Sequence, residues 1–170
     1  MKKFFPIIMT VAICFFLFES SSGQELKSVK IAELNVLVAP PTAAGTKIIY
    51  PITGGTISGE INGKVLPIGG DFGMLISPTT FKLDIREVIQ TTDSATIYIT
   101  YNGYIHADPE TFGLLVTGRA NEVSPEKYYF RINPIFETTS DKYDWLNHTI
   151  TVGVGTVTET GVSYILYAIR

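Results

Sequence analysis

The sequence predicts an all-β protein that forms a single antiparallel barrel, closed or nearly closed, with one short helix. Three observations lead to this fold class. Strand-like segments recur with turn signals about every ten residues. Two of these segments alternate apolar and polar residues, and a glycine-dense run from Ile52 to Gly73 marks places where a sheet can bend or bulge. We therefore expect one domain of about eight to ten strands that closes on itself.

The N-terminal segment has the features of an export signal. Two lysines precede an apolar run from Phe4 to Phe18, and small residues follow. The apolar run is shorter than the roughly 20 residues needed to span a bilayer. We expect residues 1–23 to be a signal peptide and residues 24–170 to be a single β-barrel domain. The domain would be exported to the periplasm or the extracellular space and would not associate with the membrane after signal cleavage.

The net charge, the few cysteines and histidines, and the absence of certain motifs exclude several classes of binding partner and cofactor. The chain has a net charge of −3 and no run of basic residues, which argues against nucleic acid and anionic membranes. Its one cysteine, Cys14, lies in the expected signal peptide. The two histidines, His106 and His148, show no metal-binding spacing, and no phosphate-binding or dinucleotide-binding motif opens a helix. We expect no metal, no cofactor and a small organic ligand, and a homodimer only because twofold symmetry is common.

Most expected strands follow from alternation and turn signals. Apolar residues alternate with polar ones from Phe81 to Ile89 and from Ala95 to His106, and Thr92 to Ser94 supplies a turn, so these segments predict a hairpin. The other expected strands are 29–38, 47–50 leading into the glycine run, 128–131 resuming at 135–138 after an interruption at Asn133-Pro134, 145–154 and 162–169.

One short helix is expected between the strands. Asp108 is a good N-cap residue, Pro109 suits the first helical position, and Glu110 places an acid where the helix dipole favours it. Thr111 to Thr117 would form about two turns, and the following glycine would end them. A helix of this length is a plug or lid and not a second domain.

Several short sequence motifs are spread, in order, over nearly the whole chain after the expected signal peptide. They are Pro51–Gly55, Gly63–Pro67 with Gly69–Asp71, Asp84 with Arg86, Thr92-Asp93, Ile97-Tyr98 with Asn102-Gly103, Tyr128–Arg131, Phe136–Thr138 and Tyr143–Asn147. Together they resemble domain of unknown function family 3237. The resemblance implies a calycin-like or streptavidin-like barrel with a ligand-sized interior, and it carries no settled activity. The chain departs from the family motifs at Phe72, where tryptophan is usual, and at Ser94, where glycine is usual.

The polar residues of these motifs share one class of strand face, and two interpretations of that face stay open. It is either the wet exterior of the barrel, which is normal for a soluble sheet, or the lining of a polar cavity. On the second interpretation, Arg86 and Arg131 would hold an anionic or carbonyl oxygen. The candidate ligand-binding residues are then Tyr98, Asn102, Tyr129, Trp145 and Asn147.

Asp71 follows two glycines, which also allows two interpretations. It is either a turn residue that bonds its own backbone or a carboxylate at the barrel mouth that acts as a general acid or base. Asp84 is the second candidate for moving a proton. We expect an exported barrel that binds a small polar or aromatic molecule, with acid–base chemistry of the lyase, isomerase or cyclase type as a further expectation. The alternatives are a non-catalytic carrier or sensor and a structural or interaction barrel with a packed interior.

Overall fold

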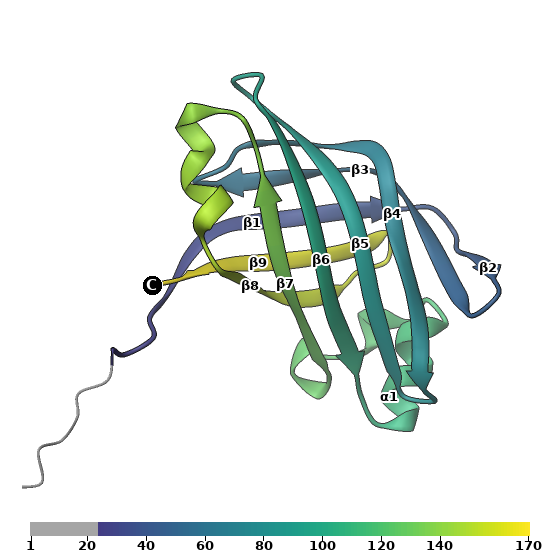
Figure 1. Cartoon of the computed structure of the whole chain (residues 1–170). Coiled ribbons are helices and arrows are strands. Elements are labelled where there is room, and N and C mark those ends of the chain that lie inside the picture. Colours follow the sequence, from purple (N-terminus) through teal and green to yellow (C-terminus); the bar gives the residue numbers. More distant parts are fainter. Residues whose placement is uncertain (1–23) are drawn as a thin grey trace, which may run out of the picture.

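The protein folds into one barrel of antiparallel strands (Figure 1). The computed structural model describes residues 24–170, so the expected signal peptide lies outside the described residues. The strands are β1 (Ser28–Val38), β2 (Thr42–Ala44), β3 (Lys47–Gly59), β4 (Gly63–Ser77), β5 (Thr80–Thr91), β6 (Thr96–His106), β7 (Tyr129–Glu137), β8 (Thr151–Val157) and β9 (Gly161–Ile169). The helices are α1 (Pro109–Val116) and three 3₁₀ helices, η1 (Ala120–Glu122), η2 (Pro125–Lys127) and η3 (Asp141–His148).

The main sheet closes through its first strand. β1 pairs with β9 on one side and with β3 on the other, and the strands between them pair with their neighbours in chain order. The short β2 pairs only with β3. Every pair is antiparallel, and closure removes the unpaired edges that an open sheet would present. The predicted fold class is therefore confirmed.

The elements with strong local signals form where the sequence predicts them. β5 and β6 make the expected hairpin, with Ser94 in the left-handed conformation of the turn at φ 68°. Asp108 caps α1 by accepting hydrogen bonds from the backbone N–H groups of Glu110 and Thr111. The helix ends before Gly118, which has φ 79°.

Two elements differ from the prediction. The segment 145–154 is not one strand, because η3 continues to His148 before β8 begins. Buried Tyr143 and Leu146 are three residues apart, which is the spacing of one face of a 3₁₀ helix. β7 runs through Asn133-Pro134 without the expected interruption, and Pro134 pairs with Tyr101 of β6.

The glycine run forms most of β3 and β4, where the sheet is irregular as expected. The pairing of these strands shifts between Pro51 and Gly55, and that of β4 with β5 shifts between Val65 and Gly69. Gly69 has φ 104°, and a Cβ atom there would lie 2.0 Å from the backbone oxygen of Arg86. Only glycine permits this approach of the two backbones.

The barrel has a filled end and a hollow end. Ile89, Ile97 and Ile99, near the β5–β6 turn, are fully buried, and η3 lies at the same end, where Lys142 pairs with Asp93 (Figure 1). The other end carries α1 and encloses a cavity. Among residues 24–170, no helix is long and apolar enough to cross a membrane.

Candidate functional site

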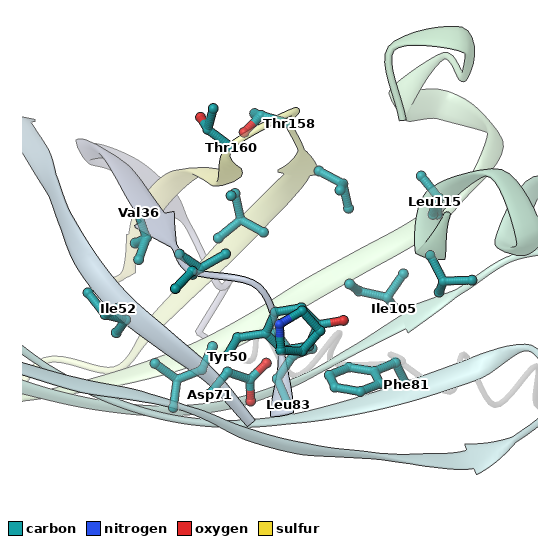
Figure 2. Close-up of a pocket in the computed structure, with 18 of the residues that line it drawn as sticks. Val36, Tyr50, Ile52, Asp71, Phe81, Leu83, Ile105, Leu115, Thr158 and Thr160 are labelled. Atoms are coloured by element: carbon teal, nitrogen blue, oxygen red, sulfur yellow. The ribbon is translucent and has the colours of Figure 1, made fainter. Parts of the chain in front are cut away.

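The cavity at the α1 end of the barrel has the size of a ligand site. Its volume is about 540 Å³, within the range of about 300–1,000 Å³ that is typical of pockets for small molecules. Inward-facing side chains of the barrel strands form its wall. Residues 39–41, one face of α1 and residues 158–160 of the β8–β9 turn contribute most of the rest of the lining (Figure 2).

Apolar and aromatic side chains dominate this lining. The aromatic members are Tyr50, Phe81, Tyr101, Phe112 and Tyr164. Among the described residues that line the cavity, the charged side chains are Asp71 and Glu159, and none is a lysine, arginine or histidine. The cavity is therefore an apolar space with an acidic polar component.

Asp71 is the buried acid of the cavity wall. It is a strand residue of β4 and not a turn residue, only 8% exposed, and its carboxyl group faces the cavity with Thr158 and Thr160 on the far side (Figure 2). One carboxylate oxygen accepts a hydrogen bond from the backbone N–H of Asp84 at 2.9 Å. Burial raises the pKa of Asp71 to about 7, although the hydrogen bond from Asp84 opposes this effect. A carboxyl group with this pKa can both accept and donate a proton near neutral pH.

A second buried acid lies deeper in the barrel. Glu87 of β5 is 1% exposed, and both of its carboxyl oxygens lack a hydrogen-bond partner among residues 24–170. Burial raises the pKa of Glu87 to about 8, and the nearby hydroxyl of Tyr101 partly offsets that rise. The hydroxyls of Tyr101 and Tyr164 are equally buried and have no hydrogen-bond partner within the described chain.

The two tyrosines connect the acids. Their rings pack edge to face with centroids 5.7 Å apart, and both rings line the cavity. Burial raises the pKa of Tyr101 and of Tyr164, and the charges of Asp71 and Glu87 raise both further. Asp71, Tyr101 and Tyr164 therefore share the cavity wall, and Glu87, which does not line the cavity, is buried beside Tyr101.

The face that carries most predicted site residues is the outer face of the barrel, which is the first of the two interpretations. Arg86, Asn102, Tyr129 and Arg131 are exposed, and Tyr98 is half-buried and outside the cavity lining. The second interpretation, a polar cavity lined by this face, is wrong because the alternate side chains of β5 and β6 point inward. These are Leu83, Ile85, Glu87, Ile99 and Tyr101.

The outer residues make contacts of their own. Arg86 donates to the carboxylate of Asp84 at 2.8 Å, and the guanidinium of Arg131 lies 5.3 Å from the ring centre of Tyr129. Asp84 therefore touches the site only through its backbone N–H, which donates to Asp71. The structure separates these arginines from the cavity lining.

The last two predicted residues lie at the opposite end of the barrel. Trp145 and Asn147 belong to η3, and neither lines the cavity. The side chain of Asn147 accepts from the N–H of Thr138 at 2.9 Å and donates to the carbonyl of the same residue. This pair of bonds fixes η3 to the end of β7. Of the predicted site residues, only Asp71 lies in the cavity wall.

Glu87, Tyr101 and Tyr164 are buried polar residues that the sequence prediction does not single out. A signal for Glu87 exists, because it shares the parity of Phe81, Leu83, Ile85 and Ile89 and is the one charged residue among them. An acid on the apolar parity of a strand predicts a buried carboxyl group. Tyr101 is part of the apolar set of β6, but nothing local in the sequence distinguishes it from an ordinary core tyrosine.

Known proteins resemble the chain over most of its length. A UPF0311 protein of Bradyrhizobium diazoefficiens is 36% identical over 118 residues, which are 69% of this chain and 76% of that protein. The crystal structure of a conserved protein of unknown function from Rhodopseudomonas palustris has a TM-score of 0.82 and 29% identity, and the match covers 87% of this chain and 99% of that one. The crystal structure of an enzyme from Penicillium herquei has a TM-score of 0.63 and 22% identity, with 88% and 98% covered, and it shows the shared fold.

The family assignment rests on a longer match. Residues 27–169, which include every strand of the barrel, match the family described as protein of unknown function (DUF3237). The resemblance predicted from the ordered motifs is thereby confirmed. The chain belongs to this DUF3237 family of uncharacterised proteins.

Proposed function

We propose that the protein binds a small organic molecule in the barrel cavity and that Asp71 exchanges a proton with it. The observation that carries the proposal is a carboxyl group with a pKa of about 7 in the wall of an apolar cavity of about 540 Å³. A carboxyl group tuned to neutral pH and facing an enclosed space is the usual arrangement for general acid–base catalysis. Reactions that need only proton transfer, such as isomerisation, elimination or cyclisation, require no further cofactor.

Two further points are consistent with this proposal. A protein of the same fold from Penicillium herquei is described as an enzyme. At 22% identity, this likeness shows only that the fold is compatible with catalysis. The cavity also argues against the alternative of a barrel with a fully packed interior. Export of the domain remains part of the proposal, and it would place the substrate outside the cytoplasm.

A non-catalytic carrier is the second candidate function. The mostly apolar lining favours it, since such a lining can hold a ligand by burial alone. The two candidates differ at Asp71. A carrier would keep its ligand unchanged when Asp71 is altered, whereas an acid–base enzyme would lose turnover.

Incubation with a metabolite extract in D₂O tests the proposal. Wild-type protein, Asp71→Asn and Arg131→Ala are incubated with the same extract, and mass spectrometry then records retained compounds, products and compounds that gain deuterium. We expect the wild type to convert or deuterate at least one compound, Asp71→Asn to lose at least a hundredfold of that rate, and Arg131→Ala to keep it. The asparagine preserves the shape of the side chain but cannot act as a base.

Each other outcome has a distinct meaning. Retention of a compound by all three proteins without deuterium gain or product identifies the carrier. Loss of turnover in Arg131→Ala alone would move the site to the outer face, as in the polar-cavity interpretation of the sequence. No retention and no conversion by any of the three proteins would contradict binding in the cavity.

A further inference from the structure

The charged groups inside the barrel are all acidic. Among residues 24–170, the buried ionisable side chains are those of Asp71, Glu87 and the tyrosines, and no lysine, arginine or histidine is buried. Buried carboxyl groups in proteins are ordinarily paired with a cation or a metal. No group of three or more potential metal ligands occurs in the described part of the chain.

The nearest basic side chains lie outside the cavity. The ammonium of Lys47 is 3.9 Å from the outer carboxylate of Asp84, and Arg86 bonds the same carboxylate at 2.8 Å. Both are among the more exposed side chains of this region, and neither lines the cavity. Asp71 therefore has no cationic partner among the side chains that line the cavity, although burial raises its pKa and the charge of Lys47 slightly opposes that rise.

The aromatic side chains of the lining can contact an organic cation that carries an apolar ring or chain. Aromatic rings attract organic cations through their negative faces, most strongly where water is excluded. Tyr50 pairs with Asp71 in the strand register and lines the cavity, and Phe81 packs edge to face on Tyr50 with centroids 6.2 Å apart (Figure 2). Tyr101 and Tyr164 belong to the same wall but are only 1% and 0% exposed. Glu159 adds a second carboxylate to the lining, in the β8–β9 turn. A ligand carboxylate or phosphate would meet two acids and no base.

We infer that the cavity selects a compact organic cation, a primary amine on an apolar ring or chain, and excludes organic anions. The ammonium would pair with Asp71 and the apolar frame would contact the aromatic rings. This inference rests on the proposed function only in assuming that the cavity binds a small molecule. It also replaces the sequence expectation of an arginine-bound anionic ligand, since both arginines are outside.

Binding should depend on pH through Asp71. Because its pKa is about 7, the cation binds best once the carboxyl group has lost its proton, so affinity for an amine rises from about pH 6 to about pH 8. The titratable or charged groups that act on Asp71 or are acted on by it are Tyr50, Lys47, Asp84, Tyr101 and Tyr164, and Glu87 acts on the last two. Glu87 ionises only near pH 8, and its charge would add to the same trend.

Three ligands of similar size test the inference. They are 1-naphthylmethylamine, 1-naphthalenemethanol and 1-naphthoate, which carry a positive, a neutral and a negative group on one ring system. Calorimetric titration of the wild type at about pH 6 and about pH 8 is expected to give amine affinity about tenfold above that of the alcohol at the higher pH and a smaller preference at the lower pH. No binding of the naphthoate is expected at either pH.

Asp71→Asn and Glu137→Gln are the matched variants. The first removes the buried acid, and amine affinity should fall to that of the alcohol. The second makes the same change of acid to amide on the exposed outer side of β7 and should leave the tenfold preference unchanged. Circular dichroism checks the fold of both, and the pH dependence of the wild type tests the inference without any substitution.

The outcomes separate the inference from the function on which it rests. Equal binding of the three ligands, or tighter binding of naphthoate, overturns charge selection while leaving ligand binding in place. A preference for the amine that survives in Asp71→Asn overturns the role of that residue. Binding of none of the three ligands contradicts the proposed small-molecule site itself.

Discussion

Each face of β5 carries a carboxylic acid, but one acid is ion-paired near the surface and the other is buried without a partner among the described residues. On the outer face, the carboxylate of Asp84 is partly exposed and accepts a hydrogen bond from Arg86 at 2.8 Å. On the inner face, Glu87 is 1% exposed and has no hydrogen-bond partner among residues 24–170. The carboxyl groups whose pKa is strongly raised are the buried ones of Asp71 and Glu87, and neither belongs to an ion pair within the described chain. Desolvation, and not a charged partner, gives the inner acids their properties.

The largest expected effect is the pH dependence of stability that Glu87 imposes. Its pKa is about 8 in the folded protein against 4.5 for an unperturbed glutamate, so the folded state holds the proton more tightly. The contribution of Glu87 to stability is therefore fully present below pH 4.5 and is lost as the pH rises through 8, a change of about 5 kcal/mol in total. Glu87→Gln has no proton to lose, so its free energy of unfolding should exceed that of the wild type by a margin that grows over this range.

Urea unfolding at about pH 5 and about pH 9 measures this margin. Asp71 contributes a fall of the same sign, since its pKa is also raised, and that part remains in the variant. Glu137→Gln on the outer side of β7 is the control and should change the margin by less than about 0.5 kcal/mol. A margin for Glu87→Gln that stays constant with pH would show that Glu87 is not a buried neutral acid.

The second effect concerns how the inner acids are brought together. Gly69 of β4 lies opposite Glu87 in the strand register, two residues before Asp71. Alanine at Gly69 would need φ 104° and would place its Cβ atom 2.0 Å from a backbone oxygen, so the strands must separate. We expect Gly69→Ala to lower the free energy of unfolding by about 3 kcal/mol or more.

Gly113 in α1 is the matched control for this substitution. A Cβ atom there meets nothing within 4 Å, and its backbone is helical. Gly113→Ala should stabilise the protein by about 0.5–1 kcal/mol, because alanine has the higher helix propensity. Urea unfolding of both variants is the measurement. Equal effects of the two substitutions would mean that close backbone contact does not position the inner wall.

Local signals explain which parts of the fold could be predicted from the sequence. The β5–β6 hairpin and the cap of α1 depend on residues close together in the chain, and both form as expected. Period-two alternation also divides the residues of β5 correctly into two sets. The alternation does not show which set faces inward. A barrel with its polar residues outside and a barrel with its polar residues around an inner cavity give the same sequence pattern.

The candidate site was harder to predict because it is not local. Asp71, Glu87 and Tyr164 come from three strands, and only closure of β1 onto β9 and β3 brings the last of them near the others. Glu87 does leave a local mark, as the charged member of an apolar parity. The cavity leaves none, since its volume depends on how α1 and the β8–β9 turn meet the barrel end.

The smallest expected effect belongs to the ion pair of Asp84 and Arg86 on the outer face of β5. Arg86 is about half exposed and bonds a carboxylate that is also partly exposed, so water competes with the pair and salt screens it. Arg86→Ala should therefore lower the free energy of unfolding by less than about 1 kcal/mol and change amine affinity by less than about twofold. Unfolding in urea at low and high salt, with the amine titration repeated, measures both quantities. A tenfold loss of amine affinity would contradict this expectation. It would show that Arg86 acts on ligand binding in the cavity, since a half-exposed ion pair outside the lining should not change affinity by that much.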